Sequence, residues 1–196
     1  MQIACVLKQG PEYKPCHVYA LADSILRHNP GAQIGCLTDV ALSHPAITAL
    51  PLRHGWQGWW SKLELFRPGL FDGPTLYLDL DTVVTGKLPP IGPRFTMLPN
   101  VYRQGDYGSG VMSWQRAPVH LYQRFAEAPA QFMRQYKTAA QWGDQAFVRD
   151  HLGNTPDTFG PEYRSYKVHC KPRVPSGTRV VYFHGNPRPW QVSLCL

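Results

Sequence analysis

The chain carries the stretch Leu76-Tyr77-Leu78-Asp79-Leu80-Asp81-Thr82-Val83-Val84, in which two aspartates end an apolar run. A buried strand of this kind carries both carboxylates to its C-terminal end, which is where open α/β sheets bind ligands. Two carboxylates this close disfavour each other's charge unless a proton or a divalent cation joins them. The stretch therefore predicts a strand that ends at a cation site. The alternative is a strand that ends in a solvated polar turn.

A β-α-β unit is predicted upstream of this strand. The segments Ile3–Leu7 and Gln33–Leu37 indicate buried strands, and apolar residues at helical spacing indicate a helix over Val18–Leu26. Such a unit favours parallel strands with a right-handed crossover. Further helices are predicted at Ser61–Phe66, Val119–Ala126, Ala130–Tyr136 and Asp144–His151, and further strands at Phe95–Leu98, Gly110–Trp114 and Arg179–Phe183. The 19 prolines and 17 glycines imply many long loops over a single α/β core.

Composition and charge narrow the class of protein. The 196 residues suffice for one sizeable domain, and 43% hydrophobic with 17% charged residues is typical of a globular protein. The 20 Lys and Arg against 13 Asp and Glu leave a formal charge of +7, which favours anionic ligands such as nucleotides. The basic residues are scattered and no zinc-finger spacing occurs, so nucleic acid is not an expected partner.

The cysteines and the hydropathy of the sequence indicate in which cellular compartment the protein is expected. The five cysteines are odd in number, form no CxxC motif, and are Cys5, Cys16, Cys36, Cys170 and Cys195. This pattern favours free thiols in a reducing compartment. The N-terminal apolar segment is too short for a signal peptide, and no apolar run approaches the roughly 20 residues of a membrane span. We expect a cytoplasmic protein without a membrane span.

Two segments on either side of the aspartates carry further candidate site residues. Lys62 follows Trp59-Trp60-Ser61 on a predicted helix, from which it could reach an aspartate or a diphosphate; the alternative is a surface lysine. Ser109 lies in Gly108-Ser109-Gly110, where the glycines let the backbone approach a ligand and the hydroxyl bond a sugar. The alternative for this segment is an ordinary glycine turn before a strand.

The C-terminal half carries the remaining candidates. Asp144 and Gln145 open a predicted helix, where Asp144 is a candidate site residue or an acid favoured by the helix dipole. His184 ends the last predicted strand, where its imidazole could complete a metal site begun by the two aspartates. Gly185 permits close backbone approach, and Arg188 supplies a fixed positive charge.

Three tryptophans lie close together in the sequence, at Trp56, Trp59 and Trp60. Such a cluster can stack a sugar or fill the core. Large aromatic side chains usually serve burial, so we expect core or loop packing for this cluster.

Taken in order, five of these segments resemble the glycosyltransferases of family 8, the glycogenin-like enzymes, and related small bacterial or viral transferases. The family shows a basic helix, a Tyr-Leu-Asp-x-Asp strand, an Asn-Ser-Gly-Val-Met turn, an Asp-Gln pair and a His-x-x-Gly-x-x-Lys-Pro-Trp ending. The corresponding segments here are Lys62, Tyr77-Leu78-Asp79-Leu80-Asp81, Ser109-Gly110-Val111-Met112, Asp144-Gln145 and His184-Gly185-Asn186-Pro187-Arg188-Pro189-Trp190. Two departures are Gly108 in place of asparagine and a shorter ending with Arg188 in place of lysine.

The resemblance implies an α/β protein with the GT-A fold: one Rossmann-like domain over residues 1–196 with a mixed, mostly parallel sheet flanked by helices. The nucleotide-binding part would cover about residues 1–85, and the sugar and acceptor part about 86–196. It also implies a nucleotide-sugar donor, most often a UDP-sugar, an acceptor that the motifs do not identify, and retention of anomeric configuration.

The same resemblance implies roles for the candidate residues. Asp79, Asp81 and His184 would hold Mn²⁺ or Mg²⁺, and the metal would bridge the diphosphate. Donor binding would fall to Lys62, Asp39, Asp79, Gly185 and Arg188, with Asp39 accepting a bond from uracil or ribose. Catalysis at the sugar would fall to Ser109, Asp144 and Gln145. A strand-end turn residue is the alternative for Asp39.

Two other classes of protein stay open at this stage. Haloacid-dehalogenase phosphatases carry an Asp-x-Asp-x-Thr/Val motif, which Asp79-Leu80-Asp81-Thr82-Val83 fits, with Asp79 phosphorylated and Asp81 as acid/base. Against this class, the motif follows a complete β-α-β unit rather than lying near the N-terminus. The other class is a non-catalytic domain that binds a nucleotide-sugar without turnover, which the missing asparagine and the short chain favour.

Overall fold

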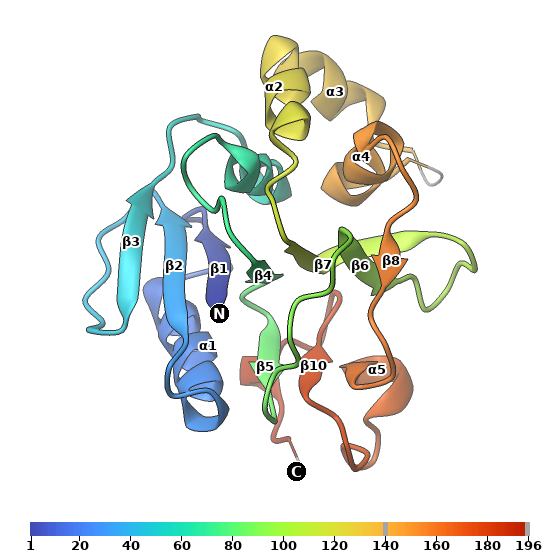
Figure 1. Ribbon diagram of the computed structural model, residues 1–196. Coiled ribbons are helices and arrows are strands. Elements are labelled where there is room, and N and C mark those ends of the chain that lie inside the picture. The colour runs from blue at the N-terminus through green and yellow to red at the C-terminus, as the bar shows by residue number, and fades with distance from the viewer. Residues whose placement is uncertain (139–140, 195–196) are drawn as a thin grey trace.

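The computed structural model describes residues 1–138 and 141–194 and has three layers, with a central sheet between two sets of helices (Figure 1). The central sheet has seven strands in the order β3-β2-β1-β4-β7-β6-β8, and a second sheet has three strands in the order β5-β10-β9. The expected single α/β domain with a mixed, mostly parallel sheet is confirmed.

The N-terminal half of the central sheet is parallel. β1 (Gln2–Leu7), α1 (Pro15–His28) and β2 (Gln33–Thr38) form the predicted β-α-β unit, with Cys5 opposite Cys36 in the strand register. β3 (Ile47–Pro51) continues the sheet at the outer edge and was not predicted, because its side chains are mostly exposed and lack an apolar pattern. α1 begins with Pro15, whose fixed φ suits the first helical position.

The direction of the sheet changes at β4 (Thr75–Leu78), which is parallel to β1 and antiparallel to β7 (Tyr107–Trp114). β6 (Thr96–Pro99) pairs antiparallel with β7, and the short β8 (Asp157–Thr158) closes the edge. Because β4 ends at Leu78, the two aspartates lie just beyond it. The backbone N–H of Asp79 still donates to the carbonyl of Gly110 on β7, at 2.8 Å.

The second sheet receives the chain directly after the aspartates. β5 (Thr82–Val84) pairs antiparallel with β10 (Val180–Tyr182), which pairs parallel with β9 (Tyr163–Ser165). The helices α5 (Tyr166–His169) and η2 (Pro189–Gln191) flank this sheet. The two aspartates therefore lie at the junction between the two sheets.

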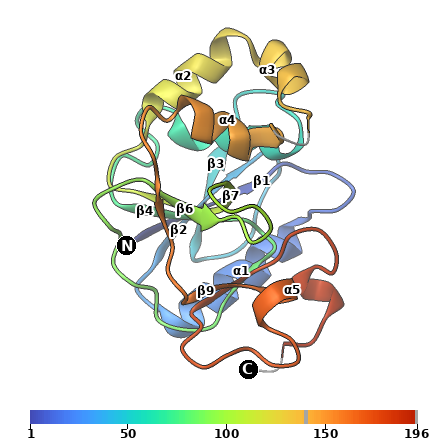
Figure 2. The ribbon, with the colours of Figure 1, turned by 90° about the vertical axis from the view of Figure 1, so that its right-hand side faces the viewer.

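Helices cover the central sheet on both sides. The 3₁₀ helix η1 (Gly58–Phe66) and the helices α2 (Val119–Glu127), α3 (Pro129–Gln135) and α4 (Gly143–His151) cover one face. α1 and the second sheet lie on the opposite face (Figure 2). Within the described part of the chain, no helix combines the length and apolar character needed to cross a membrane.

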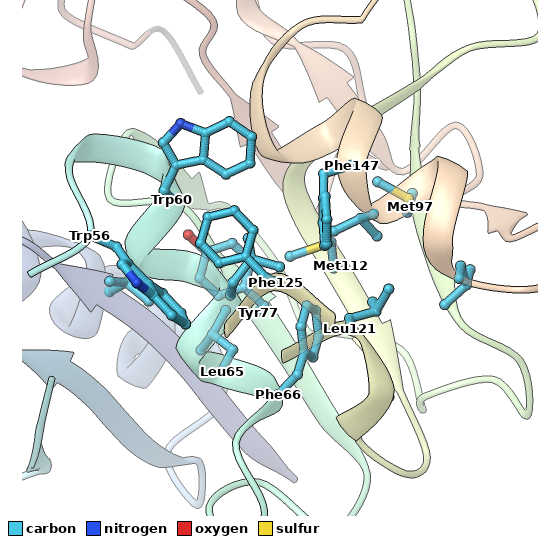
Figure 3. Close-up of a cluster of buried hydrophobic side chains, with 14 of the residues drawn as sticks. Trp56, Trp60, Leu65, Phe66, Tyr77, Met97, Met112, Leu121, Phe125 and Phe147 are labelled. Carbon is cyan, nitrogen blue, oxygen red and sulfur yellow. The ribbon is translucent and has the colours of Figure 1, made fainter. Parts of the chain in front are cut away.

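The sheet separates two hydrophobic cores, as the alternation along β1 requires. Ala4 and Val6 face the core beneath η1 and α2–α4, whereas Ile3, Cys5 and Leu7 face the core with α1. The first core is rich in aromatic rings from several elements, which converge as shown in Figure 3.

The elements predicted from the sequence are confirmed, with shifts of a few residues at their ends. One difference lies in the segment predicted as a short helix at Ser61–Phe66, which is part of the longer 3₁₀ helix η1. Core or loop packing was predicted for the tryptophan cluster: Trp56 and Trp60 are buried in the core, whereas Trp59 is 45% exposed and packs against the backbone at Gly143. The described cysteines are free thiols, and Cys195 lies outside the described residues.

The aromatic core should depend strongly on Phe125. Its ring is fully buried, stacks on Trp60 with 5.1 Å between ring centroids, and meets Trp56 and Phe147 edge-on. We expect Phe125→Ala to lower the free energy of unfolding by about 3–5 kcal/mol, because it removes a ring and leaves a cavity. Chemical denaturation measures this loss.

The control is Val168→Ala, which truncates an apolar side chain that is 48% exposed. It should change the free energy of unfolding by less than about 0.5 kcal/mol. Similar losses in the two variants would contradict the assignment of Phe125 to a tightly packed core.

Candidate functional site

A buried lysine brings three segments together beside the central sheet. Lys62 on η1 places its Nζ 2.9 Å from Oδ1 of Asp79, at the end of β4, and 3.5 Å from Oδ2 of Asp144, on the first turn of α4. The Lys62 side chain is only 11% exposed. Both carboxylates therefore share one buried ammonium group.

The charges in this cluster shift one another's pKa values. Burial alone would lower the pKa of Lys62, but the carboxylates of Asp144 and Asp79 raise it above its ordinary value. Burial raises the pKa of Asp144, while the charge of Lys62 and the neighbouring Ser109 hydroxyl act in the opposite direction. The net direction of the shift in the pKa of Asp144 is upward. The carboxylate of Asp144 is thus a buried acid whose nearest cation is the Lys62 ammonium, 3.5 Å from Oδ2.

Asp79 is also held by its own strand and by the neighbouring one. The Tyr77 hydroxyl donates to Asp79 Oδ1. On β7, a Cβ at Gly110 would lie 3.3 Å from Asp79 Oδ2, which is closer than most such contacts. Gly110 therefore lets β7 approach the Asp79 carboxylate, and the predicted approach of this segment to a ligand stays a prediction.

Asp81 has different partners on the other side of the junction. Its side chain is buried, pairs with the Arg188 guanidinium, and accepts a hydrogen bond from the Tyr13 hydroxyl at 3.3 Å. Burial and the negative charge of Asp79 raise the pKa of Asp81 to about 7, against the opposing charges of Arg188 and Lys62. Asp79 and Asp81 are thus close enough to disfavour each other's charge.

Arg188 joins the C-terminal segment to the loop before α1. Its Nε donates to Glu12 at 2.6 Å while its Nη1 pairs with Asp81. Two residues later, Trp190 stacks on His17 with 3.8 Å between ring centroids. The C-terminal segment therefore lies over the Asp81 side of the site.

His184 lies next to this site but is turned toward β9. The N–H of Phe183 donates to the carbonyl of Asp81 at 3.1 Å, so the backbone at His184 is adjacent to the aspartates. The imidazole Nε2 is instead 2.7 Å from Oγ of Ser165. Burial and the charge of Lys167 lower the pKa of His184. Gly185 has a φ of +65° and approaches the Lys167 ammonium.

A divalent cation needs several oxygen or nitrogen donors close together. No group of three His, Cys, Asp or Glu side chains within the described residues is arranged to hold a metal ion. Asp79 and Asp81 nevertheless fit a hard cation, since Mg²⁺ in particular binds one or two carboxylates and completes its shell with phosphates and waters. Burial and the negative charge of Asp79 both raise the pKa of Asp81, and a bound cation would offset both effects.

The other two candidates lie at the margins of this cluster. Asp39 follows β2 at the same edge of the sheet and accepts hydrogen bonds from Lys8 Nζ at 2.6 Å and Gln9 N–H at 2.9 Å. Burial raises the pKa of Asp39, but these bonds outweigh it, so the net direction is downward. Gln145 is half-buried on the first turn of α4, next to Asp144.

The structure thus brings together Lys62, Asp79, Ser109 and Asp144, and beside them Asp81 and Arg188. It does not bring the His184 imidazole to the carboxylates. Sequence reasoning missed four contributors: Glu12, Tyr13, the Tyr77 hydroxyl and Lys167. The signal for Tyr77 was present in the alternation of the strand, which turns residues 77 and 79 to the same side.

Removing the shared lysine should destabilise the protein. Lys62→Met leaves Asp79 and Asp144 without their common counter-ion, so we expect the free energy of unfolding to fall by about 3 kcal/mol. Chemical denaturation at neutral pH measures this loss. The control is Lys8→Met, which breaks a more exposed pair with Asp39 and should cost less than about 1 kcal/mol. Equal losses would contradict the shared-counter-ion role.

Several solved structures share this fold. The galactosyltransferase LgtC, in complex with donor and acceptor sugar analogs, matches with a TM-score of 0.70 and 15% identity over 97% of this chain and 89% of that chain. The glycosyltransferase GlyE of Streptococcus pneumoniae TIGR4 matches with a TM-score of 0.64 and 12% identity over 98% of this chain and 56% of that chain. The bifunctional glycosyltransferase WbbM matches with a TM-score of 0.61 and 14% identity, covering 96% and 46%.

No protein-family model matches the chain, and neither does the sequence of any curated protein. At identities of 12–15%, the structural likeness concerns the fold alone. The chain has the GT-A-type fold of these glycosyltransferases, as the resemblance of its motifs implies.

Proposed function

We propose that this protein is a metal-dependent glycosyltransferase that moves a sugar from a UDP-sugar to an acceptor. The observation that carries the proposal is the pair Asp79 and Asp81 at the C-terminal end of β4, each held by a basic side chain, in a fold shared with glycosyltransferases. This edge of the sheet is where α/β proteins bind ligands. The combination of acidic and basic groups suits a diphosphate accompanied by a cation.

Asp79 and Asp81 would hold Mn²⁺ or Mg²⁺, with His184 as a third ligand once its ring leaves Ser165. A bound cation would neutralise charge that develops on the diphosphate as the glycosidic bond breaks. Support for His184 comes from its backbone, which Phe183 fixes beside Asp81. A neutral imidazole is the form that binds metals, and burial lowers the pKa of His184 in that direction.

Arg188 and Lys62 would bind the diphosphate oxygens. Arg188 pairs with the partly exposed Glu12 as well as with Asp81, whereas both partners of Lys62 are largely buried. If Asp81 held a cation, the guanidinium of Arg188 could turn to a phosphate, which it recognises with two parallel bonds. Gly185 would let the backbone approach the same phosphates, and Lys167 beside it adds positive charge. Asp39 would accept a bond from ribose or uracil at the β2 end.

Ser109, Asp144 and Gln145 would face the transferred sugar. Support for this role comes from the adjacency of Asp144 to Ser109 and Lys62 at the end of β4. The carboxylate of Asp144 would accept a hydrogen bond from a sugar hydroxyl. We propose retention of anomeric configuration, because no carboxylate other than those already paired is placed as a general base among the residues discussed. An inverted product in an NMR assay would overturn retention.

The shared fold favours a transferase over the haloacid-dehalogenase phosphatase considered from the motif alone. The free thiols Cys5, Cys16, Cys36 and Cys170 suit a reducing compartment such as the cytoplasm.

The donor class can be tested by ligand-dependent thermal stability. We expect UDP with Mn²⁺ to stabilise the protein by about 2.7 kcal/mol at a hundredfold excess over the dissociation constant, and either one alone to act much less. Differential scanning fluorimetry with UDP, GDP and UDP-sugars, each with and without Mn²⁺, measures the shift. Asp81→Asn should fold and lose the joint effect. A joint effect retained in this variant would remove Asp81 from the site.

Arg188 should contribute to donor binding through its charge and its planar shape. We expect Arg188→Ala to weaken binding of UDP with Mn²⁺ by about tenfold or more, measured by calorimetry, because a charge-assisted bond to phosphate is lost. Arg188→Lys should recover part of the affinity. The control is Arg94→Ala, which removes an exposed arginine paired with Asp157 and should leave UDP affinity unchanged. Equal affinity of the wild type and Arg188→Ala would refute this role.

A further inference from the structure

Two tryptophans are exposed side by side at the margin of the site. Trp59 on η1 is 45% exposed and Trp142, just before α4, is 52% exposed, whereas Trp56, Trp60 and Trp114 are buried. The two exposed rings lie 6.0 Å apart between centroids and are inclined by 44°. They form an open, tilted pair of aromatic faces.

The pair is fixed in place by the backbone between it and the site. Gly143 has a φ of +64°, and a Cβ there would lie 3.0 Å from Nε1 of Trp59, so the indole of Trp59 packs against a position open only to glycine. The N–H of Gly143 donates to the carbonyl of Tyr136 at 3.0 Å, which holds the start of α4. The two rings are therefore exposed even though a hydrogen bond holds the backbone at Gly143.

The pair is also continuous with the charged cluster. Asp144 follows Gly143 directly, and Lys62 follows Trp59 by three residues on η1. These two residues meet at 3.5 Å and are both buried. The two tryptophans and this charged pair therefore belong to the same two segments, η1 and the start of α4, where the proposed function places the transferred sugar.

We propose that Trp59 and Trp142 form the platform that binds the acceptor, and that the acceptor is a saccharide with a pyranose ring at its reacting end. This inference rests on the proposed function. The C–H face of a pyranose ring is apolar and stacks on an aromatic face, whose electron-rich surface attracts the C–H groups, while the hydroxyls point outward to polar partners. Asp144 and Lys62 are such partners at the inner end of the platform.

The size of the exposed patch favours a sugar over a protein. A tryptophan buries about 150–250 Å² when covered, so two half-exposed rings offer roughly 200 Å². A stable protein interface needs about 800 Å² from each partner, whereas one or two sugar rings fit the smaller area. The patch is also below the few hundred Å² of apolar surface that marks a protein or membrane contact.

The test is saccharide titration of ¹⁵N-labelled protein, observed through the six indole N–H signals. The probes are lactose, maltose, cellobiose and N,N′-diacetylchitobiose, each with and without UDP and Mn²⁺. We expect at least one saccharide to shift the signals of Trp59 and Trp142, assigned through Trp59→Phe and Trp142→Phe. The signal of the buried Trp114 serves as the reference for changes elsewhere in the fold.

Alanine and phenylalanine variants separate stacking from simple structural support. Trp59→Ala and Trp142→Ala should each weaken saccharide binding by about tenfold, as expected for loss of an aromatic anchor, while the phenylalanine variants keep most of the affinity. Binding of UDP with Mn²⁺ should stay within about twofold of the wild type in all four variants, because Asp79, Asp81 and Arg188 lie on other segments of the chain than the two tryptophans.

The outcomes distinguish this inference from the proposed function. If UDP with Mn²⁺ binds and no saccharide shifts either indole signal, the platform is refuted and the transferase assignment stands. If saccharides bind at both tryptophans and UDP with Mn²⁺ does not bind, the platform stands and the transferase assignment fails. Saccharide affinity that is unchanged in both alanine variants refutes the platform.

Discussion

The site depends on one buried ammonium group, that of Lys62, shared between two carboxylates. A charge with 11% exposure is tolerated only when paired, and each of its partners, Asp79 and Asp144, needs the lysine for the same reason. The three residues belong to η1, to the end of β4 and to the start of α4, so the requirement for pairing fixes these elements relative to one another. The aromatic core beneath η1, α2 and α4 supplies the packing, and the charges determine which ends of those elements meet.

A second constraint comes from the junction between the two sheets. β4 belongs to the central sheet and β5 to the smaller one, and only residues 79–81 lie between them. The backbone of Asp79 is bonded to Gly110 on β7, and that of Asp81 to Phe183 after β10. Each aspartate is therefore anchored to a different sheet, which holds two repelling carboxylates close together without a bond between them. Burial and this nearby charge together raise the pKa of Asp81.

Much of this arrangement was accessible from the sequence, and the reasons for the rest are physical. Period-two and helical patterns located the buried strands and helices, and the order of the motifs led to the fold and to Lys62, Asp79 and Asp144. β3 was not predicted because an edge strand needs no apolar pattern. β5 was not predicted because three residues are too few to show an alternation of apolar and polar side chains. Glu12 and Tyr13 were not predicted as site residues because they lie at the site only through long-range contacts. Glu12, for example, pairs with Arg188, which lies 176 positions away, and no local sequence pattern indicates such a contact. The turn of His184 toward Ser165 is a rotamer choice, which sequence spacing does not determine.

Charge balance explains why the two halves of the site differ. On the Lys62 side, the ammonium group is buried between two carboxylates, and moving it would leave both without a partner. On the Arg188 side, the guanidinium has one buried partner, Asp81, and one exposed partner, Glu12, so water compensates for part of its loss if it moves. Breaking the Arg188 pairs should therefore cost less free energy than breaking the Lys62 pairs. The Arg188 side is thus the one at which an exchange of ion pairs with an incoming ligand would cost least.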